Sequence, residues 1–329
     1  MLFSRFLNRL VSGSLLSALL IGTPAVASDL KIGVSNSPMS LPFAVADQQN
    51  FFEKYGVTVE LVKCLGGIRC VRELIDQKVD MATSSELPVL FNSFDTSNLS
   101  ILATFSQNND DLKLIVSKEL AGKKPSDWED RRVGMVFKSA SQYYADVALL
   151  YHGIDPRAVK YVSLAPEELP NAILNGKVDA ISTWEPYGHL TKKAETDKVV
   201  VLKTPKLYQQ NFILTTTKDY SKSNTEKIGA VLKALNAANH YILKYPVQAQ
   251  QIMIKHSNVD QDFIKENWND YRFTLTLQKS LITTMEGEAR WIIREHHVQR
   301  DAKMPDVSKL IDASHLNRLS PQAIDFSYK

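Results

Sequence analysis

From residue 30 onward, short apolar runs rich in β-branched residues alternate with longer stretches that have helical spacing. The short runs predict a first series of strands at 30–34, 57–62, 79–83 and 100–105, and further strands at 111–117, 131–136, 159–164, 178–183 and 198–202. The longer stretches predict helices at 43–55, 71–78, 86–94, 139–153, 166–177 and 185–190. This alternation is typical of α/β proteins, so we expect βαβ steps to build a parallel sheet from the first series and a second α/β lobe from the rest.

The last third of the chain is predicted to be mainly helical. A strand at 211–217 leads out of the second series, and residues 226–245 have amphipathic spacing that ends before Pro246. We expect these C-terminal helices to pack on one of the two lobes.

One phrase occurs twice, as "KVDMATSSEL" at 78–87 and as "KVDAISTWEP" at 177–186. In each copy an aspartate leads a buried strand that ends in hydroxyl residues, and a helix follows. We interpret Asp80 and Asp179 as structural residues that fix the turn before each strand. Ligands of open α/β sheets gather beyond the carboxyl ends of the strands, where helix N-termini offer free N–H groups. We therefore expect the residues after each strand to face a cleft between two sheet edges.

The first 27 residues have the pattern of a signal peptide. Arg5 and Arg9 form a basic start, "LVSGSLLSALLIG" is an apolar stretch, and "AVA" at 25–27 offers a cleavage site after Ala27. The alternative is a membrane anchor, but serines and a glycine shorten the apolar run below the ~20 residues that span a bilayer. We expect export to the periplasm.

Composition agrees with an exported globular protein. Cleavage would leave 302 of the 329 residues, enough for two lobes, and would lower the formal net charge from +3 to +1 by removing two arginines. A near-neutral chain without a basic run argues against nucleic acid as a partner.

The two cysteines, Cys64 and Cys70, predict one disulfide in an exported protein. A metal site is the alternative, but no histidine is near in sequence and the spacing is not that of a zinc knuckle. His296 and His297 are adjacent and do not share a helix face. The chain has no nucleophile elbow, phosphate-binding loop or dinucleotide fingerprint. We expect no metal, no cofactor and no catalytic residue.

Several motifs together resemble a known family. They are "LKIGV" after the signal peptide, "ADQQNFFEKYGVTVELV", the Gly-Gly turn before "ELIDQKVDMATSSELPVL", "RRVGMVFKSASQYY" and "ILNGKVDAISTWEPY". This order resembles the periplasmic solute-binding proteins of ABC importers, in the nitrate, sulfonate, taurine and thiamine-precursor group. The resemblance covers about residues 29 to 270.

The resemblance implies a two-lobed α/β fold of the type II, Venus-flytrap kind, with two hinge crossings and C-terminal helices. Lobe 1 would comprise 28–114 plus 218–329, and lobe 2 would comprise 115–217. The implied function is capture of one small polar molecule by a monomer and its delivery to an ABC permease in the inner membrane. Two alternatives stay open: a ligand-sensing partner of a membrane sensor kinase or cyclase, and an enzyme of the thiamine-precursor branch, against which export argues.

The predicted ligand-binding residues follow the strand ends and helix starts that would face the cleft. They are Trp184 and Glu185; Ser84, Ser85 and Glu86; Lys138, Ser139 and Ser141; Ser37, Met39 and Phe43; Gln107 and Asn108; and Arg69. Each has a structural alternative, such as helix capping for Ser85 and Glu185, core packing for Trp184 and Phe43, and a solvated turn around Asp110 and Asp111.

The charge of the ligand stays open at this point. Glu86 and Glu185 favour an amino-bearing ligand, whereas Lys138, Arg69 and the helix N-termini favour an anion. A zwitterion would satisfy both. This sequence departs from the family's commoner pattern at two places. The Cys64–Cys70 turn stands where many relatives have a Gly-Gly-Ser turn, and Glu86 stands where they have a small residue or proline. The ligand therefore need not be one of the best-known sulfonates.

Overall fold

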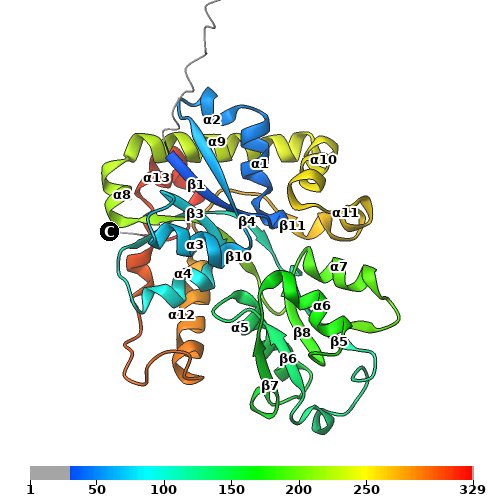
Figure 1. The fold of residues 1–329 in the computed structure, drawn as a ribbon. Helices are drawn as coiled ribbons and strands as arrows, with labels where there is room; N and C mark the ends of the chain where they lie inside the picture. Colours follow the sequence, from blue (N-terminus) through cyan, green and yellow to red (C-terminus); the bar gives the residue numbers. More distant parts are fainter. Residues whose placement is uncertain (1–29, 328–329) are drawn as a thin grey trace, which may run out of the picture.

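The computed structural model describes residues 30–327, and the predicted signal peptide lies outside them. Figure 1 shows two lobes, each built around its own sheet, with the C-terminal helices on the upper one. None of the described helices is long and apolar enough to cross a membrane.

The first lobe is built on a six-stranded mixed sheet in the order β11-β4-β10-β3-β1-β2. Its strands are β1 (Leu30–Ser35), β2 (Val59–Cys64), β3 (Met81–Ser85), β4 (Leu99–Asn108), β10 (Gln210–Thr217) and β11 (Tyr271–Arg272). Every residue of β3 and β4 is buried, whereas β2 at the edge is half exposed. Central strands buried on both faces explain why these segments are continuous apolar and hydroxyl runs.

The second lobe is built on a five-stranded sheet in the order β7-β6-β8-β5-β9. Its strands are β5 (Leu112–Ser117), β6 (Arg132–Met135), β7 (Lys160–Ser163), β8 (Ala180–Trp184) and β9 (Val199–Leu202). The order β7-β6-β8 repeats the order β2-β1-β3 of the first sheet, and the pairs within both triplets are parallel.

The four strands of the first series, β1 to β4, run in the same direction as predicted, but the sheet is mixed because two later strands run against them. The returning strand β10 inserts antiparallel between β3 and β4, and β11 pairs antiparallel with β4. In the second sheet, β5 lies antiparallel beside β8. Strand direction there depends on where the chain crosses between lobes, which local patterns do not encode.

The repeated phrase occupies equivalent places in the two sheets. Asp80 Oδ2 accepts a hydrogen bond of 2.7 Å from the N–H of Lys31 in β1, and Asp179 Oδ2 accepts one of 2.9 Å from the N–H of Arg132 in β6. Each aspartate thus ties the start of the third strand of its series to the first strand, which confirms their structural role.

The chain crosses between the sheets twice, from β4 to β5 and from β9 back to β10. Two crossings and a return to the first lobe are the arrangement expected of the fold. The exact lobe boundaries at 114/115 and 217/218 stay a prediction. Strand β5 of the second sheet begins at Leu112, and strand β10 of the first sheet begins at Gln210. The chain therefore enters each sheet a few residues before the predicted boundary.

Helices cover both sheets and fill the C-terminal part. They are α1 (Leu41–Gln48), α2 (Phe51–Lys54), α3 (Gly67–Ile75), α4 (Glu86–Ser93), α5 (Ala140–Tyr151), α6 (Leu169–Leu174), α7 (Tyr187–Ala194), α8 (Lys218–Ser223), α9 (Thr225–Lys244), α10 (Pro246–Ser257), α11 (Gln261–Asn267), α12 (Lys279–Arg294) and α13 (Ser314–Leu319). The helix predicted at 43–55 is divided into α1 and α2, because Asn50 between them has a φ of 53°. The helix predicted at 71–78 starts four residues earlier, inside the cystine turn.

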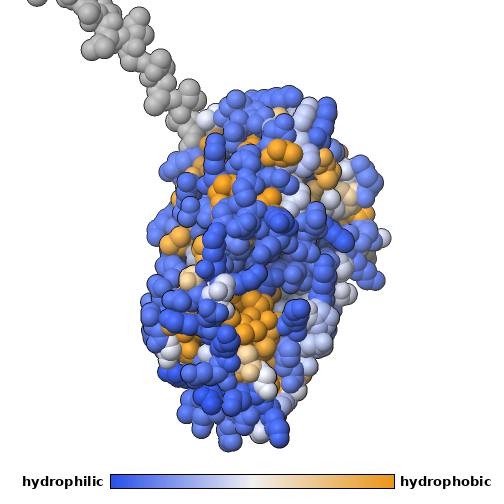
Figure 2. Space-filling model, turned by 90° about the vertical axis from the view of Figure 1, so that its right-hand side faces the viewer, coloured by the Kyte–Doolittle hydropathy of each residue, from blue (hydrophilic) through white to orange (hydrophobic). Residues whose placement is uncertain are grey.

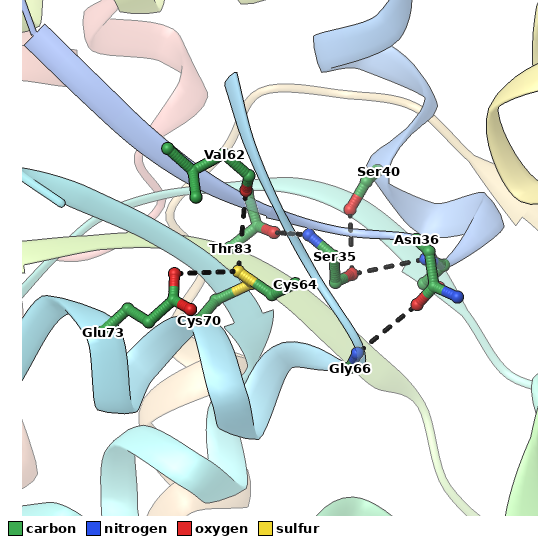
Figure 3. The surroundings of a disulfide bond; sticks show 10 residues. Ser35, Asn36, Ser40, Val62, Cys64, Gly66, Cys70, Glu73 and Thr83 are labelled. Atoms are coloured by element: carbon green, nitrogen blue, oxygen red, sulfur yellow. Dashed lines mark hydrogen bonds between the residues drawn. A yellow bond between two sulfur atoms is a disulfide. The ribbon is translucent and has the colours of Figure 1, made fainter. Parts of the chain in front are cut away.

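Cys64 at the end of β2 and Cys70 in α3 form the predicted disulfide (Figure 3). The closed turn also contains Gly66, whose N–H donates to Asn36 Oδ1 at 3.3 Å. Closing so short a ring contributes about 2 kcal/mol in the chain-entropy model. The turn therefore joins β1, β2 and α3 into one rigid edge of the first lobe.

Figure 2 shows that one face of the molecule is mostly hydrophilic, with an apolar patch on its lower half. Among the large apolar side chains of the second lobe, Leu190 and Val200 are 40% and 36% exposed. Because β9 is an edge strand, its outer residues have no further strand to cover them.

Two glycines in helices offer a matched test of packing. A Cβ added to Gly67 would lie 2.6 Å from the Cα of Ser84, whereas a Cβ added to Gly229 in α9 would meet nothing within 4 Å. We expect Gly67→Ala to lower the free energy of unfolding by about 1–3 kcal/mol. Gly229→Ala should raise it by about 0.5–1 kcal/mol through helix propensity. Urea unfolding measures the free energy of unfolding of both variants. Equal changes in the two variants would contradict the close approach of α3 to β3.

Candidate functional site

A cavity lies between the two lobes at the carboxyl ends of the parallel strands. Its volume is about 20 Å³, enough for about one water molecule. The residues that line it come from both lobes and from both crossings: Ser37, Gly66, Gly67, Ile68, Ser85, Pro88, Asp111, Ser139, Ala140, Trp184, Gln210 and Phe212. Small-molecule sites commonly measure about 300–1,000 Å³, so a bound molecule requires the lobes to separate or the lining to move.

Three helices begin at this cavity. The N-cap residues of α3, α4 and α5 are Gly66, Ser85 and Ser139, and all three line it. The first N–H groups of a helix have no partner inside the helix and carry a partial positive charge. The arrangement can therefore accept oxygen atoms of an anion or a carbonyl group.

Trp184 forms the apolar wall on the side of the second lobe. It is the last residue of β8 and is 8% exposed. A Cβ on Gly66 would approach its ring to 3.2 Å, so the glycine lets the turn of the first lobe lie flat against the indole. Gly66 also has a φ of 81°, which other residues rarely adopt.

Four of the predicted residues line the cavity: Ser37, Ser85, Ser139 and Trp184. The hydroxyl of Ser85 does not cap α4, in contrast to the alternative interpretation. Ser139 does cap α5, because its Oγ accepts from the N–H of Ser141 at 3.2 Å.

Four more of the predicted residues are buried behind this lining. Glu185 accepts a hydrogen bond of 2.8 Å from the N–H of His189 and so caps α7. Ser141 Oγ accepts a hydrogen bond of 3.0 Å from the N–H of Val136. Ser84 donates to the carbonyl of Ser85, and Glu86 faces away into the first lobe. Each of these contacts shapes the turn that carries a lining residue.

The remaining predicted residues are not part of the lining. Met39 and Phe43 are fully buried in the core, and Gln107 and Asn108 make hydrogen bonds at the end of β4. Lys138 is exposed, and its φ of 60° lies in the left-handed region. The contacts agree with core packing for Phe43 and with a solvated side chain for Lys138, whereas Gln107 and Asn108 are buried and do not form the solvated turn given as their alternative.

Arg69 lies at the mouth of the cleft, where it bridges the two lobes. Its guanidinium is 2.9 Å from the carboxylate of Glu167, in the 3-10 turn Pro166–Glu168 of the second lobe. Both side chains are nearly half exposed, so the pair contributes at most about 1 kcal/mol. Its effect is on closure of the lobes rather than on the cavity lining.

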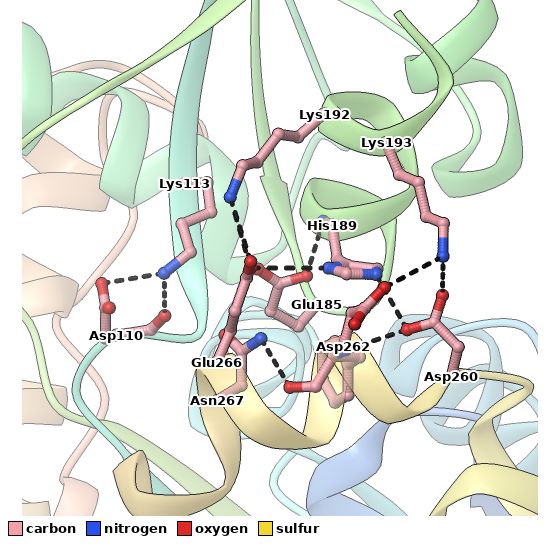
Figure 4. Close-up of polar contacts among 11 residues, drawn as sticks. Asp110, Lys113, Glu185, His189, Lys192, Lys193, Asp260, Asp262, Glu266 and Asn267 are labelled. Atoms are coloured by element: carbon pink, nitrogen blue, oxygen red, sulfur yellow. Dashed lines mark hydrogen bonds and ion pairs between the residues drawn. The ribbon is translucent and has the colours of Figure 1, made fainter. Parts of the chain in front are cut away.

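A second contact between lobes joins α7 to α11 (Figure 4). The ring of His189 lies 3.2 Å from Asp260 and 3.8 Å from Glu266. Lys192 pairs with Glu266 at 3.3 Å, and Lys193 pairs with Asp260. A third contact joins α12 to α5, where Trp291 Nε1 donates to Asp146 Oδ2 at 2.8 Å. Together these contacts surround the cavity and hold the lobes together.

Asp111, Gln210 and Phe212 were not predicted as site residues. Asp111 is 2% exposed, so the interpretation of 109–111 as a solvated turn is wrong at this position. Asp111 lies at the first crossing, directly before β5, whereas Gln210 and Phe212 lie in β10 and reach the cavity through its antiparallel return to the first sheet. Of these three residues, only Asp111 had a signal in the sequence, because it is an acidic residue between two predicted strands.

In residues 30–327, no group of three or more His, Cys, Asp or Glu side chains is arranged to hold a metal ion.

Comparison with known proteins identifies the family. Residues 37–249 match the model of the NMT1/THI5-like family, which covers well over half of the chain. The chain belongs to this family. The match includes both copies of the repeated phrase and the whole of the cavity lining.

The relatives of this NMT1/THI5-like protein include named binding proteins. The taurine-binding periplasmic protein of Escherichia coli (strain K12) is 25% identical over 232 residues, which cover 68% of this chain and 71% of that protein. The crystal structure of the periplasmic aliphatic sulphonate binding protein SsuA from Escherichia coli superimposes with a TM-score of 0.72 at 18% identity, over 86% of this chain and 96% of that one. The alkanesulfonate-binding protein SsuA from Xanthomonas axonopodis pv. citri, bound to MOPS, gives a TM-score of 0.74 at 15% identity, over 87% and 98% of the two chains. The structural likenesses show the fold.

The NMT1/THI5-like protein also buries two glutamates, one at the start of α4 and one in α12. Glu86 accepts hydrogen bonds from the hydroxyl of Tyr208 at 2.7 Å and the N–H of Asn211 at 3.2 Å. Burial raises the pKa of Glu86 to about 7. Burial, and then the nearby Glu86, raise the pKa of Glu288 in α12 well above its usual range. Two buried carboxylates near each other resist simultaneous ionisation.

This pair predicts a pH-dependent stability. A carboxyl whose pKa is raised on folding binds more protons in the native state, so stability falls as pH rises from about 4.5 through 7. We expect Glu288→Gln to raise the free energy of unfolding at pH 8 by about 1–3 kcal/mol and to have a smaller effect at pH 5. Urea unfolding at both values measures this.

Glu286→Gln is the control, because Glu286 is on the same helix with its side chain 43% exposed. It should change stability by less than about 0.5 kcal/mol at either pH. If Glu288→Gln raised the free energy of unfolding equally at pH 5 and pH 8, this would contradict the interpretation of Glu86 and Glu288 as an interacting buried pair.

Proposed function

We propose that this protein is the solute-binding component of an ABC importer. It works outside the cytoplasmic membrane as a monomer, captures a small polar molecule between its lobes and delivers it to the permease. The observation that carries this proposal is the cavity between the lobes, which is lined from both sheets and by three helix N-termini. Further support comes from the family and from the named taurine-binding relative.

The proposed mechanism is closure around the ligand. Trp184 and Ser139 come from the second lobe, and Gly66, Gly67 and Ser85 come from the first. These contacts act on one molecule together only when the lobes are closed. A ligand that touches both sides therefore shifts the population toward the closed form, which the permease can distinguish from the open form.

The chemistry of the lining favours a compact ligand with an oxyanion group. N–H groups at the starts of α3, α4 and α5 can donate to its oxygens, while Trp184 and Phe212 cover an apolar part. Micromolar affinity corresponds to about 8 kcal/mol, which a few such hydrogen bonds and one aromatic wall can provide after ordering costs. Taurine and short alkanesulfonates have this combination of groups.

The described residues contain a Ser–His–Asp cluster, but its geometry differs from that of a catalytic triad, which agrees with a binding role. Ser221 Oγ lies 2.6 Å from Asp312 Oδ2 and 2.8 Å from His315 Nε2. The carboxylate contacts the hydroxyl directly, rather than orienting the far nitrogen of the ring as in a catalytic triad. Hydrogen bonds from His315 and Ser221 hold the pKa of Asp312 well below its usual range. We propose that this cluster ties α8 to α13.

The wall formed by Trp184 gives a direct test. Isothermal titration of the mature protein with taurine and with short alkanesulfonates should find one molecule bound per chain. Trp184→Ala should lower the affinity by about 10- to 100-fold, because the variant loses one wall of a desolvated site.

Trp268→Ala is the matched control, since Trp268 packs against Phe273 at 6.0 Å in the first lobe and does not appear in the cavity lining. It should bind with unchanged affinity. Native mass spectrometry of the protein as purified tests the broader proposal by detecting a retained small molecule. Equal affinities of Trp184→Ala and the parent protein would exclude this cavity as the site.

A further inference from the structure

The acceptor groups of the cavity come from the two crossings between the lobes. Asp111 lies between β4 and β5 and is 2% exposed. Among the described residues that line the cavity, it is the only ionisable one. Its Oδ1 is 3.4 Å from the hydroxyl of Tyr271, a long hydrogen bond that leaves most of the capacity of the carboxylate unused.

Gln210 supplies a second acceptor from the other crossing, where β10 begins. Its side chain is 4% exposed, and its Oε1 has no hydrogen-bond partner within residues 30–327. A buried carbonyl without a partner costs about 1–3 kcal/mol. Because Gln210 lines the same cavity as Asp111, a donor placed there would satisfy both side chains.

Lys113, the lysine whose charge acts on Asp111, is engaged with Asp110. Lys113 Nζ lies 2.9 Å from the carboxylate of Asp110 and also donates to the carbonyl of that residue. Burial, and then the neighbouring Glu185, raise the pKa of Asp111 well above its usual range, which the charge of Lys113 offsets only in part. An ionised Asp111 therefore needs a positive charge that comes from outside the protein.

We propose that Asp111 is a specificity-determining residue that selects ligands bearing a protonated amine. The ammonium group donates to the carboxylate of Asp111 and to Oε1 of Gln210. The oxyanion end of the same molecule faces the starts of the helices, so this inference rests on the proposed function. The preferred ligand class is a short amino-substituted oxyanion, and a simple alkanesulfonate without an amine is discriminated against.

Matched pairs of probes test this selection. Taurine is compared with ethanesulfonate, β-alanine with propionate, and 2-aminoethylphosphonate with ethylphosphonate, by isothermal titration into the mature protein. In at least one pair, the amine-bearing member should bind at least about tenfold more tightly than its partner, as expected for a hydrogen bond to a charged group. Asp111→Asn should reduce that preference to less than about threefold, mainly by weakening the amine-bearing member.

Asp110→Asn is the matched control, because Asp110 is the adjacent acid, is half exposed, and is absent from the cavity lining. It should keep the preference of the parent protein, and thermal unfolding of both variants verifies that they are folded. Equal affinities within every pair, a preference that survives in Asp111→Asn, or the absence of binding by all six probes would each overturn the inference. The proposed function fails separately, if the purified protein retains no small molecule and Trp184→Ala changes the affinity for no solute.

Discussion

One carboxylate in each lobe fixes the geometry on which the cleft depends. Asp80 and Asp179 each accept a hydrogen bond from an N–H group near the start of a neighbouring parallel strand, and this contact fixes where the third strand of the series begins beside the first. That starting point and the length of the strand decide which residues stand at the carboxyl edge of the sheet. Ser85 and Trp184 are the last residues of five-residue strands that begin directly after these aspartates, and both line the cavity. The shared part of the repeated phrase is scaffold, and the residues after it differ between the lobes.

The fold could be predicted from the sequence to the extent that it is local. Strands and helices of the two series follow from apolar spacing, and the strand-end rule places Ser85, Ser139 and Trp184 at the cleft. Direction within the sheets could not be predicted, because β10 pairs with strands more than a hundred residues away. Gln210 and Phe212 depend on that pairing, so their place in the cavity has no local signal, whereas Asp111 stands between two predicted strands.

The burial of individual side chains was equally hard to predict. Met39 and Phe43 follow a strand end just as Ser37 does, yet they turn inward and Phe43 packs against Phe105 at 5.0 Å. Glu86 starts a helix at the cleft but faces Tyr208 on the other side. Local sequence patterns predict that a residue lies at the end of a strand. The direction of its side chain depends on how the other helices and strands pack around it.

The path of the chain has a consequence for how the two lobes can move. The second lobe is an insertion: the chain enters it after β4, leaves it before β10, and the described residues both begin and end on the first lobe (Figure 1). Within residues 30–327, neither end lies on the second lobe. A label, surface tether or fusion partner joined after residue 327 would therefore be attached to the first lobe. The second lobe would still be able to rotate about the two crossings, so its movement relative to the first lobe could be used to detect ligand binding.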